Sequence, residues 1–400
     1  MSGAQALPAR WTVESEHGAE VTFADGETCL DLNSGLWNAS LGYGHVRVIQ
    51  SIKNALDRIS YGAQFRRNSV LADQLAAKLL SLWEGQPFSR LMFATSGSAA
   101  NDMVIKLARS WSSRMAMRER KLIASLKGSY HGQTLGALGT SDEYLMQPEM
   151  LMDASSYRRL SVTSGDRVHE ALQRWGDKVA AVFVEPVQGT GNRTVAPGVL
   201  RELFAARREH GFLIVADEVA TGFGRTGQMF RSASWEEAPD AVVMSKGLTN
   251  GTMAMSCVLL APRIAEAFSG ESDIFPHAET QAGGALGCAA ALGVLDAFAS
   301  DLGMQTALSR LPEAGRLRSS LEQLNLDRRG IELRGEGYFY TLEMLDMPRT
   351  QPVEDLRSRG LIVHGGEQGI QLAPSYLMSE AQWSRFIETL DGYFHLLFGI

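Results

Sequence analysis

Residues 240–251, DAVVMSKGLTNG, place one lysine, Lys246, directly after an apolar run typical of a buried strand. An ammonium ion is costly to remove from water, so a lysine at the end of such a strand needs a partner or a chemical use. The break of the run into Ser, Gly and Asn marks the end of the strand. We therefore expect a buried sheet with a functional group at its edge.

Four other apolar runs end in small or polar residues in the same way: RLMFATSG (90–97), KLIASLKGSY (121–130), AAVFVEPVQG (180–189) and FLIVADEVATG (212–222). Between them lie stretches whose apolar residues are three or four apart, at 98–120, 165–176 and 198–211. This alternation predicts an α/β fold with a mostly parallel central sheet and helices on both faces. Ligands gather beyond the carboxyl ends of strands in such sheets, so the chemistry is expected there.

The two ends of the chain have a different pattern. Residues 1–45 contain a hairpin-like stretch with a turn at Asp25-Gly26, and residues 301–400 mix a helical stretch with short strands. We predict that residues 46–300 form a large domain. Residues 1–45 and 301–400 would together form one small α/β subdomain.

Composition favours small-molecule chemistry. The 400 residues are 45% hydrophobic and carry a formal net charge of −7 without a long basic run, which argues against nucleic acid or an anionic membrane as a partner. The three cysteines are far apart, and no His/Cys cluster has the spacing of metal ligands, so neither a disulfide framework nor a metal site is expected. With no signal-like start or membrane-spanning apolar run, the prediction is a cytoplasmic protein.

Two of the strand ends suit a flat, phosphorylated ligand. Gly97 and Ser98 stand just before a helical stretch, where free backbone N–H groups and the helix dipole favour a phosphate, although an ordinary serine cap is the alternative for this stretch alone. Tyr130 and His131 precede Gly132, which would let an aromatic face lie over a flat ring. Taken singly, Tyr130 fits a half-buried packing residue better, and His131 fits a hydrogen-bonded structural residue better.

Two further strand ends carry acids, Glu185 and the pair Asp217-Glu218, and buried acids need partners. One ligand accounts for the whole set, namely pyridoxal 5′-phosphate, with its phosphate, flat ring, ring nitrogen and aldehyde. A lysine held as an imine carries no full ammonium charge, and Asp217 would keep the ring nitrogen protonated, which makes the ring an electron sink. This answers why Lys246 stands at a buried strand end.

The sequence resembles the class III aminotransferases, the ornithine and ω-amino-acid type of fold-type I pyridoxal-phosphate enzymes. The resemblance covers nearly the whole chain and is carried in order by TSGSAAND (95–102), SYHG (129–132), VEPVQG (184–189), DEVATGFGRTG (217–227), SKGLTNG (245–251) and HAETQAGGALGCAAALGVL (277–295). It implies an aminotransferase that works in two stages, taking an amino group from a donor and passing it to a carbonyl acceptor.

The resemblance also implies a homodimer and a set of residue roles. Lys246 would carry the cofactor, Asp217 would pair with its ring nitrogen, and Val219 and Tyr130 would cover opposite ring faces. Gly97 and Ser98 would bind the phosphate together with Thr280 of the neighbouring subunit. The remaining assignments are Glu185 beside Asp217 as its orienting partner, His131 among the residues that bind the cofactor, and Trp37 in the substrate pocket.

Departures from the family pattern concern the substrate. Where many members carry an Arg that clamps an α-carboxylate and a Glu that pairs with it, this chain has Gln371 and Thr190, and His364 stands where others have a mobile Arg. Without a guanidinium fork, selection for an α-amino acid is expected to be weak. Other arginines that could substitute are Arg66, Arg67 and Arg193. The predicted acceptor is a ketone or aldehyde without an adjacent free carboxylate, and the chain resembles the daptide-type aminotransferases, which tailor a ketone at the end of a peptide.

Other functions stay open at this point. GFGRTG (222–227) matches the G-x-G-x-x-G fingerprint of dinucleotide-binding oxidoreductases, but the residues that follow lack the periodicity of the fingerprint's helix. Racemases and aminomutases share the fold and the lysine, so the fold alone does not choose among these reactions. A non-catalytic binding protein is disfavoured because Lys246 and Asp217 are both present.

Overall fold

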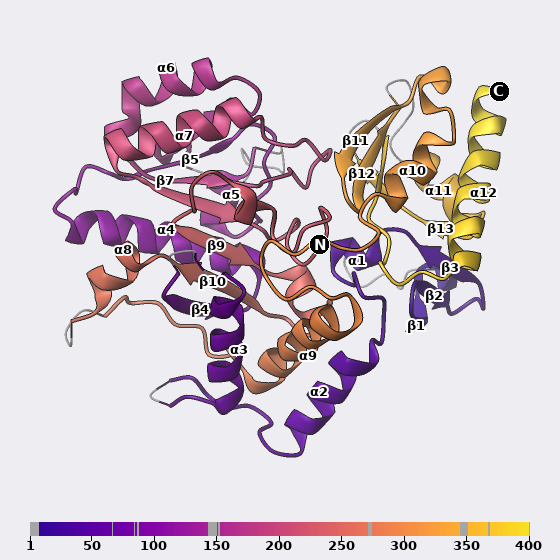
Figure 1. Cartoon of the computed structure of the whole chain (residues 1–400), viewed down its shortest axis with the longest axis horizontal. Helices are drawn as coiled ribbons and strands as arrows, with labels where there is room; N and C mark the ends of the chain where they lie inside the picture. Colours follow the sequence, from indigo (N-terminus) through magenta and orange to yellow (C-terminus); the bar gives the residue numbers. More distant parts are fainter. Residues whose placement is uncertain are drawn as a thin grey trace.

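A seven-stranded sheet forms the centre of the larger part of the molecule in the computed structural model (Figure 1). Its strand order is β4-β10-β9-β8-β7-β5-β6. The strands are β4 (Arg90–Ala94), β5 (Leu122–Leu126), β6 (Tyr157–Leu160), β7 (Val179–Val184), β8 (Leu213–Asp217), β9 (Ala241–Met244) and β10 (Ser256–Leu260). Only β10 runs antiparallel to its neighbours, which confirms the predicted α/β fold with a mostly parallel sheet.

The structure describes residues 8–65, 67–83, 85, 88–142, 150, 153–270, 274–344, 351–366 and 369–399. Within these ranges no helix is both long enough and apolar enough to span a bilayer.

Helices cover both faces of the sheet, because successive side chains of its strands point to opposite sides. Ala181 and Phe183 of β7 pack with the buried face of α4 (Gly97–Arg114), while Val182 and Val184 pack with α6 (Gly165–Trp175) and α7 (Pro197–His210). Every residue of β7 and β8 is buried, as expected of central strands covered twice.

The three helices predicted between the strands are present as α4, α6 and α7, and the predicted C-terminal end of the first is wrong. The hydroxyl of Ser96 accepts a hydrogen bond from the N–H of Ala99 and caps α4, and α7 begins with Pro197. The prediction carried the first helix to residue 120, but α4 ends at Arg114 and the backbone turns left-handed at Ala116, with φ 60°. Helical periodicity alone does not report such a turn.

The other helices are mostly short or lie around the rim. They are α1 (Ser34–Trp37), α2 (Val46–Leu56), α3 (Val70–Ser81), α5 (Leu135–Thr140), α8 (Pro262–Ala265), α9 (Ala285–Asp301), α10 (Arg316–Glu322), α11 (Gln351–Arg357) and α12 (Glu380–Phe398). Single 3-10 turns are η1 (Ala9–Trp11), η2 (Ala154–Ser156), η3 (Gly176–Lys178), η4 (Arg231–Ser234), η5 (Lys246–Thr249), η6 (Glu266–Phe268) and η7 (Leu326–Arg329). Helix α9 runs through the predicted domain boundary at residue 300 by one residue.

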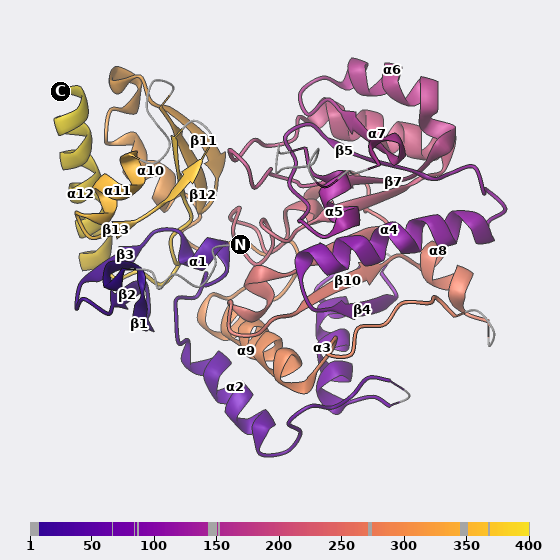
Figure 2. The ribbon, with the colours of Figure 1, turned by 180° about the vertical axis from the view of Figure 1, so that it is seen from behind.

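The smaller part of the molecule combines both ends of the chain, which lie side by side in Figures 1 and 2. One sheet has the order β1-β2-β3-β13 and the other β11-β12-β15-β14. Their strands are β1 (Val13–His17), β2 (Glu20–Phe23), β3 (Thr28–Asp31), β11 (Glu332–Glu336), β12 (Phe339–Glu343), β13 (Leu361–Ile362), β14 (His364–Gly366) and β15 (Gly369–Leu372). Strand β13 joins β3 in parallel, with Leu361 opposite Leu30, so the late chain completes a sheet begun by the early chain. The hairpin predicted at Asp25-Gly26 is the β2–β3 turn, where Gly26 has φ 88°.

Candidate active site

The ends of neighbouring strands converge on a cavity of about 180 Å³. It is lined by Trp37, Ser96, Gly97, Ser98, Asn101, Tyr130, His131, Gly132, Glu185, Asp217, Val219, Ala220, Ser245 and Lys246. These residues follow β4, β5, β7, β8 and β9, apart from Trp37, which comes from α1. Nine residues predicted from separate motifs therefore surround one cavity: Trp37, Gly97, Ser98, Tyr130, His131, Glu185, Asp217, Val219 and Lys246.

Lys246 stands just after β9 and opens the 3-10 turn η5. Its backbone has φ 44°, a left-handed conformation that costs a residue with a Cβ roughly 1–2 kcal/mol. Burial lowers the pKa of its ammonium to about 8, and the nearby carboxylates of Glu185 and Asp217 oppose that shift. The Nζ atom lies 4.2 Å from the centroid of the Trp37 ring, over its face. A substantial fraction of the lysine is therefore neutral near pH 8, and the neutral amine is the form that acts as a nucleophile or base.

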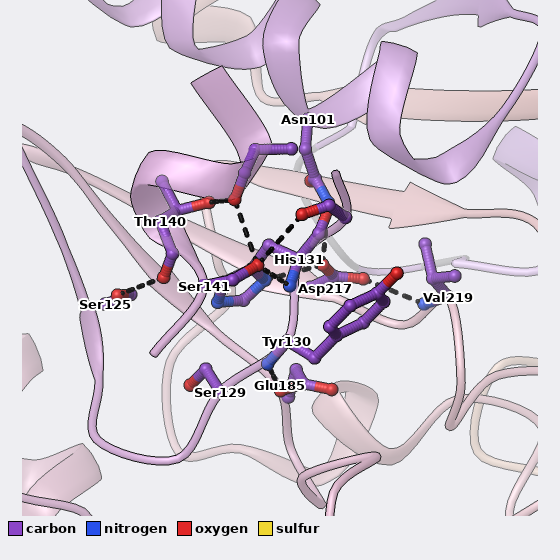
Figure 3. Close-up of polar contacts among 12 residues, drawn as sticks. Asn101, Ser125, Ser129, Tyr130, His131, Thr140, Ser141, Glu185, Asp217 and Val219 are labelled. Carbon is purple, nitrogen blue, oxygen red and sulfur yellow. Dashed lines mark hydrogen bonds and ion pairs between the residues drawn. The ribbon is translucent and has the colours of Figure 1, made fainter. Parts of the chain in front are cut away.

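Asp217 is held by three donors (Figure 3). One carboxylate oxygen lies 2.7 Å from Nδ1 of His131 and accepts a hydrogen bond of 2.9 Å from the amide of Asn101, and the other accepts from the N–H of Val219 at 3.1 Å. His131 is 2% exposed, and its Nε2 has no partner among the described residues. These three hydrogen bonds fix the orientation of the Asp217 carboxylate, which lines the cavity and can therefore accept a hydrogen bond from a ligand there.

Asn101 was not among the predicted site residues. Its amide also donates to the carbonyl of His131 at 2.7 Å, so this one side chain ties the Asp217–His131 pair to helix α4. The signal was present in the sequence, because a polar residue at a position that faces the core of an amphipathic helix needs a partner. Asn101 is 1% exposed.

Glu185 makes no hydrogen bond to Asp217 among the described residues, and its predicted role of orienting Asp217 stays a prediction. Its two carboxylate oxygens accept from backbone N–H groups, one from Tyr130 at 2.8 Å and the other from Gly189 at 2.9 Å. Burial raises the pKa of Glu185 to about 7; the charge of Asp217 adds to this rise, while His131 and the two backbone donors oppose it. The role of Glu185 is therefore to join the loop after β5 to the loop after β7, next to Lys246.

The start of α4 is closely packed against the loop after β5. A Cβ placed on Gly132, where φ is 122°, would lie 2.0 Å from the hydroxyl of Ser98, so only glycine fits there. The same hydroxyl accepts from the N–H of Gln133 at 3.2 Å. A Cβ on Gly97 would lie 3.1 Å from a methyl of Val219. Helix start and loop thus form a cradle whose backbone N–H groups suit a phosphate.

Trp37 forms one wall of the cavity. Its ring meets Phe339 edge to face at 5.0 Å between centroids and His364 at 6.0 Å. Burial lowers the pKa of His364, and the charge of Lys246 lowers it further. The imidazole at the position of a family arginine is therefore held toward its neutral form.

Gln371 lies behind the cavity and is used structurally. It is 2% exposed, and its amide donates to the carbonyl of Gly189 at 2.7 Å and to the side-chain oxygen of Asn192 at 2.9 Å. That oxygen also accepts from the hydroxyl of Thr341 at 2.6 Å. Thr190 is half-buried in the loop between these contacts. Neither Gln371 nor Thr190 lines the cavity.

Thr280 is exposed and lies outside the cavity of its own chain. Its carbonyl accepts a hydrogen bond from the hydroxyl of Tyr61 at 2.5 Å. The preceding residue, Glu279, accepts from the N–H of Thr95 at 3.0 Å, which places this segment beside the end of β4. The reach of Thr280 into a neighbouring site stays a prediction.

Comparison with known proteins shows which family has this fold and this arrangement of residues. The family model described as Aminotransferase class-III matches residues 2–394. The chain belongs to this family.

Several relatives are similar over almost the full length of this aminotransferase. The uncharacterized aminotransferase YhxA of Bacillus subtilis is 29% identical over 96% of this chain and 92% of its own. The solved (S)-enantioselective omega-transaminase from Thermomicrobium roseum is 27% identical with a TM-score of 0.85, covering 95% of this chain and 91% of its own. An amine transaminase from an uncultivated Pseudomonas species, solved in a PLP-bound form, is 26% identical with a TM-score of 0.88, covering 99% and 97%.

The enzyme has the fold-type I α/β architecture of pyridoxal-phosphate-dependent transferases, and its family uses this cofactor. The residues around the cavity fit the group. The close packing of Gly132 on Ser98 holds the loop after β5 against the start of α4, whose backbone N–H groups line the cavity at Gly97 and Ser98 and suit a phosphate. The buried carboxylate of Asp217 is braced toward the cavity, and Lys246 is buried beside it.

Proposed function

We propose that this aminotransferase passes an amino group to a ketone or aldehyde that lacks an adjacent free carboxylate. The observation that carries the proposal is the absence of arginine among the described residues lining the cavity. Gln371, at the position of the family's carboxylate clamp, is buried and spends its amide on Gly189 and Asn192. A carboxylate in this cavity would lack a bidentate, charge-assisted partner, each such hydrogen bond being worth about 1.5–3 kcal/mol.

The other arginines suggested by the sequence do not supply that partner. Arg67 and Arg193 are exposed and do not line the cavity, and Arg66 lies outside the described residues. Arg334, near the loop of Gly191, is paired with the carboxylate of Glu343 at 3.0 Å. None of these arginines is therefore placed to bind a carboxylate of the acceptor in the cavity.

The residue roles follow from the geometry, with pyridoxal 5′-phosphate supplying an electron sink for the carbon that loses its proton. Lys246 would bind the aldehyde of the cofactor and, once displaced by the donor, would remove the α-proton as a base. Asp217, braced by His131, would hold a proton at the ring nitrogen.

The remaining cavity residues would hold the cofactor and shape the substrate pocket. Gly97 and Ser98 would bind the phosphate at the start of α4, and Tyr130 and Val219 would cover the two ring faces. Trp37 would face the substrate.

Two features extend the proposal. The solved relatives described above are named as omega- or amine transaminases, which supports a simple amine or its carbonyl counterpart as substrate. We propose further that the natural acceptor is a ketone at the end of a peptide, as in daptide-type tailoring, because the neutral cavity makes no demand for a carboxylate. The assembly would be a cytoplasmic homodimer in which Thr280 completes the phosphate site of the neighbouring subunit.

A panel of amino donors tests the proposal. Holoenzyme is mixed with glutamate, alanine, 1-phenylethylamine or isopropylamine, and conversion of the cofactor to its amino form is followed by absorbance. The simple amines should convert the enzyme at lower concentration than glutamate, and a synthetic peptide ending in a methyl ketone should restore the starting spectrum. Rapid conversion by low concentrations of glutamate would contradict the neutral-cavity argument. Release of the carbonyl product distinguishes transamination from racemisation.

A further inference from the structure

The turn that carries Trp37 has an unusual backbone. Residues 34–37, labelled α1, all have positive φ: 48° at Ser34, 57° at Gly35, 57° at Leu36 and 68° at Trp37. Three of these residues have a Cβ, and a left-handed turn of this kind is unfavourable for them. Such a conformation persists only where its surroundings impose it, and it is frequent beside active sites.

Asp31 holds this left-handed turn in place through three hydrogen bonds. It is 3% exposed, and its oxygens accept from the N–H of Asn33 at 2.7 Å, the N–H of Gly35 at 2.9 Å and the hydroxyl of Tyr43 at 2.5 Å. Hydrogen bonds to a buried carboxylate are stronger than those between neutral groups. One side chain therefore fixes both the start of the turn and the tyrosine that stands against it.

Tyr43 closes the turn from the other side. A Cβ on Gly35 would lie 2.9 Å from the tyrosine hydroxyl, so the glycine and the ring are in close approach. The amide of Asn38 donates to the carbonyls of Gly35 and Leu36 at 2.8 and 2.9 Å. The other side of this arrangement borders a second cleft of about 430 Å³, lined among others by Gly35, Asn38 and Tyr43. The turn thus lies between two hollows, which leaves it room to move outward if its hydrogen bonds weaken.

We propose that Asp31, through Tyr43 and the left-handed turn, is a positioning residue that holds Trp37 beside Lys246 and so sets the largest substrate that the cavity admits. Trp37 is the link, since its ring lies 4.2 Å from Nζ of Lys246 and packs against Phe339. This inference rests on the proposed function only in taking the cavity as the amine-binding pocket. Asp31 itself does not line the cavity.

The test compares a small and a bulky amine donor. In Asp31→Asn and in Tyr43→Phe, the ratio of kcat/KM for 1-(1-naphthyl)ethylamine to that for isopropylamine should rise by about 10-fold, the difference between a charge-assisted and a neutral hydrogen bond. The change should appear in KM for the bulky donor, with kcat for isopropylamine nearly unchanged. Glu16→Gln is the matched control, because Glu16 lines the outer cleft with Tyr43 but its side chain makes no hydrogen bond to the turn among the described residues.

Two further measurements separate positioning from a general loss of structure. The affinity of holoenzyme for the non-reacting alcohol 1-(1-naphthyl)ethanol, measured by calorimetry, should rise in the Asp31 and Tyr43 variants. In a Trp37→Ala background, Asp31→Asn should no longer change the donor ratio, since the residue through which it acts is gone.

The outcomes are distinguishable. An unchanged donor ratio in Tyr43→Phe, or an effect of Asp31→Asn that survives Trp37→Ala, would overturn the inference. If Asp31→Asn does not fold, the tyrosine variant decides alone. A wild-type enzyme that converts with glutamate but with neither amine would instead count against the proposed function.

Discussion

The protonation of Lys246 in the cofactor-free protein gives the sharpest prediction. Burial lowers its pKa from the ordinary 10.5 to about 8. At pH 7.5 the Lys246 amine is then neutral in about a quarter of the molecules, whereas an ordinary lysine is neutral in about one molecule in a thousand. Its reaction with an aldehyde should therefore be roughly 200-fold faster than that of an equally accessible unperturbed lysine. The rate should rise with pH and level off just above pH 8.

The assay mixes cofactor-free protein with pyridoxal 5′-phosphate over a range of pH and follows covalent capture by stopped-flow absorbance, with N-acetyl-lysine correcting for titration of the reagent. Glu185→Gln removes a carboxylate that favours the ammonium, so the midpoint should fall by about one unit. Glu218→Gln is the matched control, because Glu218 is equally buried but bonded to Ser232 and Thr221. A rate that still climbs above pH 9.5, or an equal shift in both variants, would refute the reasoning.

The same shift predicts a change of stability with pH. The folded protein holds Lys246 with a lowered pKa, so between pH 8 and pH 10.5 the unfolded chain binds more protons and the folded state gains stability as pH rises. A shift of 2.5 units corresponds to about 3 kcal/mol for this one group. The free energy of unfolding of the wild type, relative to Lys246→Met, should rise by that amount in denaturant titrations. A flat difference would contradict the buried position of the ammonium.

Four further variants test the site. Lys246→Ala should abolish multiple turnover without lowering the unfolding temperature of the cofactor-free protein. His131→Phe removes the buried partner 2.7 Å from Asp217 and should weaken cofactor retention in equilibrium dialysis by about 10- to 100-fold. Gly132→Ala should cost roughly 2 kcal/mol or more of unfolding free energy and loosen phosphate binding, because its Cβ would meet the Ser98 hydroxyl, whereas Gly198→Ala, where a Cβ meets nothing within 4 Å, should not. Gln371→Ala should lower the free energy of unfolding by about 1–3 kcal/mol, because the partners of its amide lose their hydrogen bonds in a buried place.

The sequence predicts the central sheet well because its inner strands are buried on both faces. Strands β7, β8 and β9 read as continuous apolar runs, and their polar ends meet because parallel neighbours end at the same edge. The strands that were missed differ for physical reasons. Strand β6 is YRRL at the edge of the sheet, with one buried residue, and has no apolar run to find. Strand β10 follows β9 after only residues 245–255, too short for a parallel crossover, and that spacing was a usable signal for an antiparallel neighbour.

The site was predicted as far as chemistry is local to a strand end. Asp217 is the last residue of β8 and Lys246 stands two residues after β9, so burial and residue type were enough to suggest them. Contacts between side chains of different helices, strands and turns could not be predicted from the sequence in this way. Asn101 reaches Asp217 from helix α4, and Asp31 acts on Trp37 through a turn whose handedness no residue pattern announces. The backbone partners of Glu185 are of the same kind, since the resemblance implied a position beside Asp217 and gave no sign of the bonds to the N–H groups of Tyr130 and Gly189.

The uncharged side chains of His364 and Gln371, which lie behind the cavity, and the low pKa of Lys246 are physically connected. His364 and Gln371 stand opposite each other on β14 and β15, so the two positions at which the family resemblance led us to look for an arginine lie at one place in this fold. A guanidinium at either position would add a second buried cation near Lys246, and Arg225, fully buried, already lowers the pKa of that lysine. Amide and imidazole side chains avoid this repulsion without a bound carboxylate to offset it. Because Gln371 is also tied to Asn192, this position behind the cavity is held by hydrogen bonds within the protein, as the proposed selection of an acceptor by size requires. The described lining contains no arginine and its one lysine is Lys246, so a substrate carboxylate would find no guanidinium there to compensate its charge.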